Sequence, residues 1–109
     1  MAFVTDETIK EVAEKLGTEI YETDFRGKSR GRFAITRAQL RHALGVQKLH
    51  ATTIERLQHS ALEYGLVIID LDDLFPCIET NVVREYRRPP KSIFGAVFGP
   101  TPATEPNEE

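Results

Sequence analysis

The sequence has few of the residues that cross-link small proteins or anchor them in membranes. Among its 109 residues there are one cysteine, Cys77, one methionine and no tryptophan. A single cysteine excludes an internal disulfide and any metal site built on paired cysteines. The longest purely aliphatic run, Leu66 to Ile69, is far shorter than the roughly 20 apolar residues of a membrane-spanning helix. Met1 to Lys10 lacks the basic start and apolar block of a secretory signal. We therefore expect a reducing, cytoplasmic location and no membrane contact.

Signatures of catalysis and metal binding are also missing. The acidic residues within 70–73 lack the glycine position and the closing glutamate of a calcium loop. The three histidines lie eight and nine residues apart, which is not a zinc-ligand spacing. Residues 26–32 contain glycines and cations but not the Gly-Lys-Ser/Thr sequence of a phosphate-binding loop. The sequence therefore predicts no enzyme activity, no metal and no cofactor.

Charge is distributed unevenly along the chain. Residues 1–25 carry seven acids and two lysines, whereas residues 26–56 carry eight cations and one acid. Residues 57–83 hold five acids and no Lys or Arg, so the formal net charge of −3 conceals a cationic middle. A block of one sign favours an anionic partner such as nucleic acid. The alternative is that this block pairs with the protein's own acidic segments, and the sequence leaves both open.

The first third of the chain predicts a helix, a loop and a short strand. Thr5 is a good N-cap, acidic residues follow it, and apolar residues then recur at i, i+3, i+4 and i+7. Gly17 is the expected end of this helix. Residues 18–32 are polar, rich in glycine and cations and without periodicity, which is typical of a mobile loop. Phe33 to Ile35 is expected to be a short strand.

Two further helices are predicted in the middle of the chain. Thr36 and Thr52 are each followed three residues later by Gln or Glu, which is the spacing of a capping box. Each is followed by an apolar stripe, and Gly45 and Gly65 supply the expected stops.

Strand signals follow the third helix. Leu66 to Ile69 is apolar and mostly β-branched and precedes an acidic turn, as expected of a short buried strand. Because proline cannot donate to a strand ladder, Pro76 predicts that Leu74 to Glu79 is irregular or an edge. Thr80 to Arg87 is then predicted to be the returning strand of a hairpin whose one face packs on the helices.

The composition changes after Arg88. Prolines, glycines and acids predict a flexible tail, residues 89–109, behind a domain that spans residues 1–88. The apolar residues within 93–98 are an exception, and they are expected either to dock on the domain or to bind a partner.

The order helix, strand, helix, helix, strand, turn, strand over Thr5 to Arg88 resembles the winged-helix branch of the helix-turn-helix proteins. The resemblance is one of layout and covers about three quarters of the chain. It implies an α+β fold, a small winged-helix-like domain of three helices with a C-terminal β-hairpin and a disordered tail. In that family the second helix of the motif enters the major groove and the wing touches the backbone or minor groove. This assigns the groove-reading role to Thr52 to Tyr64.

The expected DNA contacts follow from this layout and from the cations. With Ile54 in the core, a turn of about 100° per residue places Thr52 and His59 on the outward side of the third helix. Arg37 and Arg41 are four residues apart and share one side of the second helix, where they can clamp phosphates. The predicted DNA-binding residues are Arg26, Lys28, Arg30, Arg32, Arg37, Arg41, Lys48, Thr52, Thr53, Arg56, His59, Arg84, Arg87 and Arg88.

The sequence thus predicts a small protein that binds double-stranded DNA, as a transcriptional regulator or DNA-associated accessory factor. A homodimer on a two-fold site is expected, because one reading helix offers little contact area. About six phosphate contacts predict a log-log salt slope near −5. The alternative is a protein-binding adaptor or inhibitor on the same scaffold, without nucleic-acid binding, because a fold does not determine function. In either case the tail is a candidate site for a protein partner.

Overall fold

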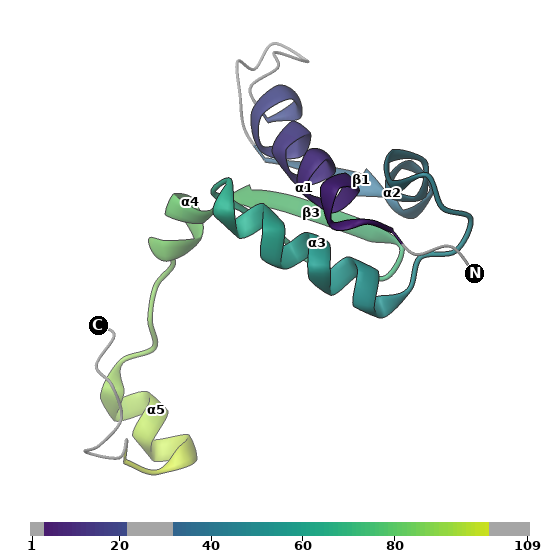
Figure 1. Cartoon of the computed structure of the whole chain (residues 1–109). Helices are drawn as coiled ribbons and strands as arrows, with labels where there is room; N and C mark the ends of the chain where they lie inside the picture. Colours follow the sequence, from purple (N-terminus) through teal and green to yellow (C-terminus); the bar gives the residue numbers. More distant parts are fainter. Residues whose placement is uncertain (1–3, 22–31, 101–109) are drawn as a thin grey trace.

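The computed structural model describes residues 4–21 and 32–100 and has an α+β fold. Five α-helices, one π-helical turn (η1) and a three-stranded antiparallel sheet lie within these residues. The three predicted helices were too few, because residues 80–84 and 91–98 are also helical. In chain order the elements are α1 (Asp6–Lys15), η1 (Leu16–Ile20), β1 (Phe33–Thr36), α2 (Arg37–Leu44), α3 (Ala51–Glu63), β2 (Leu66–Ile68), β3 (Leu74–Glu79), α4 (Thr80–Arg84) and α5 (Lys91–Phe98) (Figure 1).

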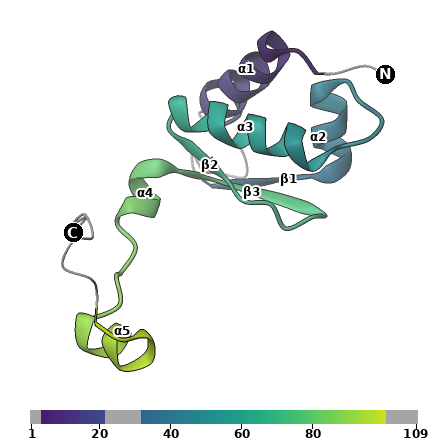
Figure 2. The same ribbon diagram turned by 60° about the horizontal axis from the view of Figure 1, so that its bottom comes forward.

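The helices α1, α2 and α3 pack on one face of the sheet. The strand order is β1-β3-β2, with β3 antiparallel to both neighbours. Figure 2 shows the three helices on the same side of this sheet. The core lies between the two layers, where Leu40 of α2, Leu57 of α3 and Phe75 and Cys77 of β3 are completely buried.

The sequence predicted that Gly17 ends the first helix, but the chain continues as a helix past this residue. Thr5 caps α1 as expected, since its side chain accepts a hydrogen bond from the Thr8 N–H. The chain then stays helical through η1, so residues 18–20, predicted as loop, are helical. A Cβ at Gly17 would lie 3.1 Å from the Tyr64 Cβ and 3.3 Å from the Tyr64 oxygen. Glycine is therefore needed where η1 passes close to the end of α3.

The predictions for β1 and α2 are confirmed. Thr36 and Gln39 form both hydrogen bonds of the capping box, and Gly45 ends α2 in the left-handed conformation with φ 71°. The predicted capping box at Thr52 is wrong. The N-cap of α3 is His50, whose extended backbone lets its carbonyl accept from the Ile54 N–H, so Thr52 already lies in the first helical turn.

Pro76 lies in the central strand, not in an edge or irregular segment as predicted. The Pro76 carbonyl accepts a hydrogen bond from the Ile69 N–H, at 2.8 Å. Because the nitrogen and carbonyl of a strand residue point to the same side, the Pro76 nitrogen also faces the β2 side. On that side Pro76 is opposite Ile69, one position past the last residue of β2. The N–H group that proline lacks would therefore not have bonded to β1, and the β1–β3 ladder is uninterrupted.

The predicted strand over Thr80 to Arg87 is wrong, because β3 already completes the hairpin. Leu66 at the start of β2 pairs with Glu79 at the end of β3. The last rung is the hydrogen bond from the Thr80 N–H to the Gly65 carbonyl, at 2.9 Å. Beyond it β2 has no residue to pair with, and the chain forms α4 instead.

Part of the predicted tail is helical. Residues 91–98 form α5, which Figures 1 and 2 both place well away from the sheet, beyond the connecting segment 85–90. The Cα radius of gyration is accordingly 17.2 Å, against about 13 Å for a compact domain of this length. Residues 101–109 of the tail lie outside the described residues. None of the described helices has the length and hydropathy of a membrane span.

Candidate nucleic-acid interface

The cations predicted to bind DNA do not form one continuous surface. Arg26, Lys28 and Arg30 lie outside the described residues, and Arg32 is exposed next to β1. Arg84, Arg87 and Arg88 lie on α4 and the segment after it. The sequence predicted them on the second strand of the hairpin, but the hairpin ends at Glu79. Arg88 Nη1 donates to the carbonyls of Arg84 and Tyr86, at 2.6 and 2.7 Å.

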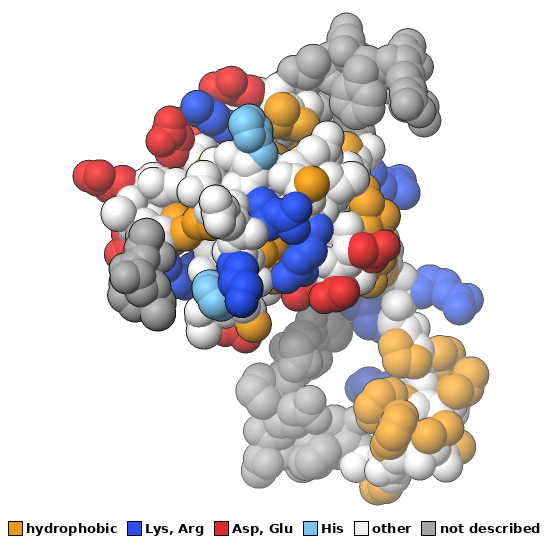
Figure 3. Space-filling view, turned by 90° about the vertical axis from the view of Figure 1, so that its right-hand side faces the viewer, with side chains coloured by type: hydrophobic (Ala, Val, Ile, Leu, Met, Phe, Trp, Pro, Cys, Tyr) orange, Lys and Arg blue, Asp and Glu red, His pale blue; other side chains and the backbone are white. Residues whose placement is uncertain are grey.

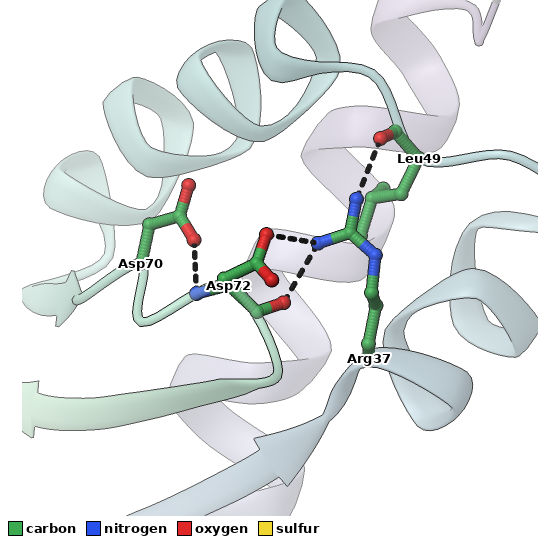
Figure 4. A network of polar contacts seen from close by, with 4 residues as sticks. All are labelled: Arg37, Leu49, Asp70 and Asp72. Carbon is green, nitrogen blue, oxygen red and sulfur yellow. Dashed lines mark hydrogen bonds and ion pairs between the residues drawn. The ribbon is translucent and has the colours of Figure 1, made fainter.

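Arg37 acts as a structural brace. Its guanidinium donates to the Asp72 carbonyl at 2.7 Å and to the Leu49 carbonyl at 2.9 Å, and it lies 3.6 Å from the Asp72 carboxylate (Figure 4). Asp70 accepts a hydrogen bond from the Asp72 N–H at 2.8 Å, which holds the β2–β3 turn in place. The start of α2, the α2–α3 connection and the hairpin turn are thereby joined. The Arg37 guanidinium thus makes contacts within the protein, at the position where the sequence predicted a phosphate clamp with Arg41.

A basic face remains on α2 and the α2–α3 connection. Figure 3 looks at this side of the molecule, where Lys and Arg side chains gather with histidines beside them and acids at the border. Arg41 is partly buried and Lys48 exposed, and the side chain of neither forms an ion pair or hydrogen bond with another described residue. Apart from Arg37, the basic residues of α2 and the α2–α3 connection are Arg41, His42, Lys48 and His50, and we call these four the basic face.

The basic face adjoins the N-terminus of α3. A depression of about 740 Å³ opens there, and Lys48, His50 and Thr52 line it. Among the described residues no side chain caps the first turn of α3, and that turn contains no acid. The free N–H groups and the positive end of the helix dipole favour an anion at this position.

The rest of α3 is less suited to a polyanion. Arg56 Nη2 donates to Asp6 of α1 at 2.7 Å, so its charge is largely compensated. His59 is exposed as predicted, but Glu55 and Glu63 are exposed along the same helix.

Thr53, one of the predicted DNA-binding residues, is buried. Its side chain is only 9% exposed, because it follows the turn of the helix onto the side that also carries Ile54 and Leu57. Thr52, one position earlier, is exposed and lies in the depression.

Sequence reasoning missed two features of this surface. The brace at Arg37 joins residues 12 and 35 positions apart, and no local pattern announces contacts of that range. The second feature is the uncapped start of α3, which was missed because the sequence pattern indicated Thr52 as the N-cap. The uncapped start could have been predicted only by recognising His50 as the last residue with an extended backbone before the helix.

In the part of the chain that the structure describes, no group of three or more His, Cys, Asp or Glu side chains is arranged to hold a metal ion. Burial raises the pKa of the Cys77 thiol to about 12, so it stays protonated at neutral pH and is a poor nucleophile.

The sequence and structure were compared with models of known families, with curated proteins and with solved structures, and none of these matches the chain.

Proposed function

We propose that this protein is a small DNA-binding module of the winged-helix type, a transcriptional regulator or DNA-associated accessory factor. The described elements follow the order helix, strand, helix, helix, strand, strand, and β3 pairs between β1 and β2. This layout supports a winged helix in which α3 follows α2 as the groove-reading helix.

The observation that carries the proposal is the basic face beside the uncapped N-terminus of α3. A DNA phosphate in the depression would accept from the first N–H groups of α3, while Lys48 and Arg41 offer cations on the same side of the molecule. Positioning contacts of this kind determine register and orientation on the duplex but carry no sequence information.

The acids of α3 determine how the helix would approach. A helix lying lengthwise in the major groove would bring Glu55 and Glu63 close to phosphates. Entry by the N-terminal end keeps both acids away from the strands and leaves Thr52 to reach a base edge, as the first residues of recognition helices do.

The test is the salt dependence of binding to a labelled generic duplex, measured by fluorescence anisotropy. We expect wild type to bind at low salt and R41E/K48E to bind at least about 10-fold more weakly, with a log-log slope shallower by about 2. The matched control is K10E/K15E, which makes the same charge change on α1 and should keep the slope. Equal losses in the two variants, or no wild-type binding at low salt, contradict the proposal.

A second function is favoured by the exposed acids of α3. Glu55 and Glu63, with Asp6 compensating Arg56, also fit a protein-binding adaptor or inhibitor that does not bind nucleic acid. Duplex binding by wild type and by the variant E55K/E63K separates the two. If α3 enters the groove by its N-terminal end, both positions stay away from the strands, and the variant should bind duplex at low salt as wild type does. If the protein is an adaptor, wild type should bind no duplex at low salt.

A further inference from the structure

The side of the sheet that faces away from the helices is apolar. Residues paired across neighbouring strands share a face, and the pairs that include Cys77 and Phe75 face the core. The alternate residues form the outer sheet face. An antiparallel sheet with one solvated face is normally polar on that side, but six of these seven side chains are apolar and none is charged. The outer sheet face consists of Ala34, Thr36, Val67, Ile69, Leu74, Pro76 and Ile78.

The three core helices leave this face uncovered. Figure 2 shows α1, α2 and α3 on the opposite side of the sheet. Ala34 is exposed, Ile69 is 38% exposed, and Val67 and Leu74 are half-buried. Ile78 is buried but does not belong to the core cluster that contains Phe75, in agreement with its place on the other face.

Helix α5 is a second apolar surface without a partner in the described structure. Ile93, Phe94, Val97 and Phe98 are 59, 42, 67 and 74% exposed. The rings of Phe94 and Phe98 are in contact, with centroids 4.9 Å apart and a tilt of 42° between their planes, so the helix presents a contiguous apolar side. Its one charged residue is Lys91 at the first position. An isolated helix of eight residues is marginal in water, and it needs a surface to pack on.

We propose that a second copy of this chain covers both surfaces, with α5 of each copy packed on the outer sheet face of the other. The sheet face and α5 are both apolar and occur once per chain, so a reciprocal exchange satisfies both and closes with two-fold symmetry. The connection between α4 and α5, residues 85–90, ends in two prolines, which hold α5 away from its own sheet and present it to another molecule.

The area is sufficient for a stable dimer. Each aromatic side chain can bury about 150–250 Å², so the four apolar side chains of α5 would bury roughly 400 Å² against a similar area of sheet. Two such exchanges bury about 1,600 Å², the size of a standard specific interface. This inference does not rest on DNA binding, and the basic face lies on the helix side of the sheet, so the dimer leaves it accessible.

The first test is the mass of the full chain in solution, by light scattering or sedimentation. We expect twice the 12.3 kDa chain mass for wild type and monomers for Val97→Asp on α5 and for Ile69→Asp on the sheet. Ala34→Asp is a second sheet variant in case Ile69→Asp disturbs the hairpin, and circular dichroism checks that each variant is folded. The matched control Ser92→Asp adds the same charge on the opposite side of α5 and should stay dimeric. A monomeric wild type, or a dimer of Val97→Asp, overturns the proposal.

The second test separates exchange from other packings. A chain with Ile69→Asp keeps an intact α5, and a chain with Val97→Asp keeps an intact sheet face. Mixing the two monomeric variants restores one of the two exchange contacts, so we expect a heterodimer at raised concentration. If α5 packed on α5, or on the sheet of its own chain, mixing would restore no dimer and the proposal would fail.

Discussion

Gly17 and Gly45 follow similar apolar helical patterns in the sequence, but the structure needs them for different reasons. Gly45 has φ +71° and open space around it, so its role is the left-handed backbone conformation at the end of α2. Gly17 is helical, and its role is the close approach of η1 to Tyr64. A glycine after an apolar helical pattern does not show whether the helix ends there or another segment passes close by, because both situations favour a residue without a side chain.

This difference predicts the effect of Gly17→Ala. The added methyl would press on the Cβ and backbone oxygen of Tyr64, the residue that ends α3. Overpacking typically costs about 1–3 kcal/mol, and the better helix propensity of alanine returns up to about 1 kcal/mol. We expect the free energy of unfolding in urea, followed by circular dichroism, to fall by about 1 kcal/mol. Gly95→Ala in α5, where a Cβ meets nothing within 4 Å, is the control and should cause no loss. An unchanged or higher stability of Gly17→Ala would refute the close approach.

At the scale of elements, the helix starts differ in how they are capped. Thr36 caps α2 with a complete capping box, whereas His50 begins α3 without a side-chain hydrogen bond. Both starts carry a threonine close by in the sequence, and only the backbone conformation distinguishes the cap from a residue of the first turn.

The caps predict three unequal effects on the free energy of unfolding. Thr36→Ala removes a cap and should cost about 1 kcal/mol, and His50→Ser supplies a missing one and should gain about 0.5–1 kcal/mol. Thr52→Ala is the comparison, because Thr52 is exposed within the first turn and caps nothing, so its effect should stay within about 0.5 kcal/mol. Urea titrations of the three variants measure these differences. A loss of about 1 kcal/mol in Thr52→Ala would instead support the start of α3 that the sequence indicated.

At the scale of the whole molecule, Cys77 reports on the closed core. It is completely buried between the sheet and the helices, so solvent reaches its thiol only when these layers separate. Burial raises its pKa from 9.0 to about 12 in the folded chain. Between these values the unfolded chain loses a proton that the folded chain keeps.

Stability should therefore fall as the pH rises from 9 towards 12. In this window the unfolded state binds fewer protons, and the free energy of unfolding falls by up to about 1.4 kcal/mol per pH unit from this residue, with no such contribution below pH 9. Urea titrations at pH 8 to 10.5 measure the slope. Since Lys and Tyr side chains titrate in the same range, Cys77→Ala is the reference, and its slope should be flatter. Parallel slopes for the two proteins would show that the thiol ionises equally in both states.

Local signals in the sequence were sufficient for several parts of this fold. The cap of α1 and the whole of α2 were predicted correctly, because the hydrogen bonds at Thr5, Thr36 and Gly45 join residues within five positions. The strand β1 was also predicted, although its partner β3 is distant in the sequence. The cationic middle of the chain was also evident, but its distribution over the surface was not. Of its described members Arg37 and Arg56 are engaged by Asp72 and Asp6, while Arg41 has no such partner.

By itself the sequence determined an α+β chain with helices that start and stop at local signals, since capping and periodicity act over a few residues. Only the tertiary structure decided that Pro76 lies in the central strand, that Thr80 begins a helix and that one face of the sheet is apolar and is not covered by α1, α2 or α3. The physical reason is that strand pairing joins segments up to 44 residues apart, as in Phe33 with Cys77. Which groups are satisfied, and which stay available to a partner, depends on these distant pairings.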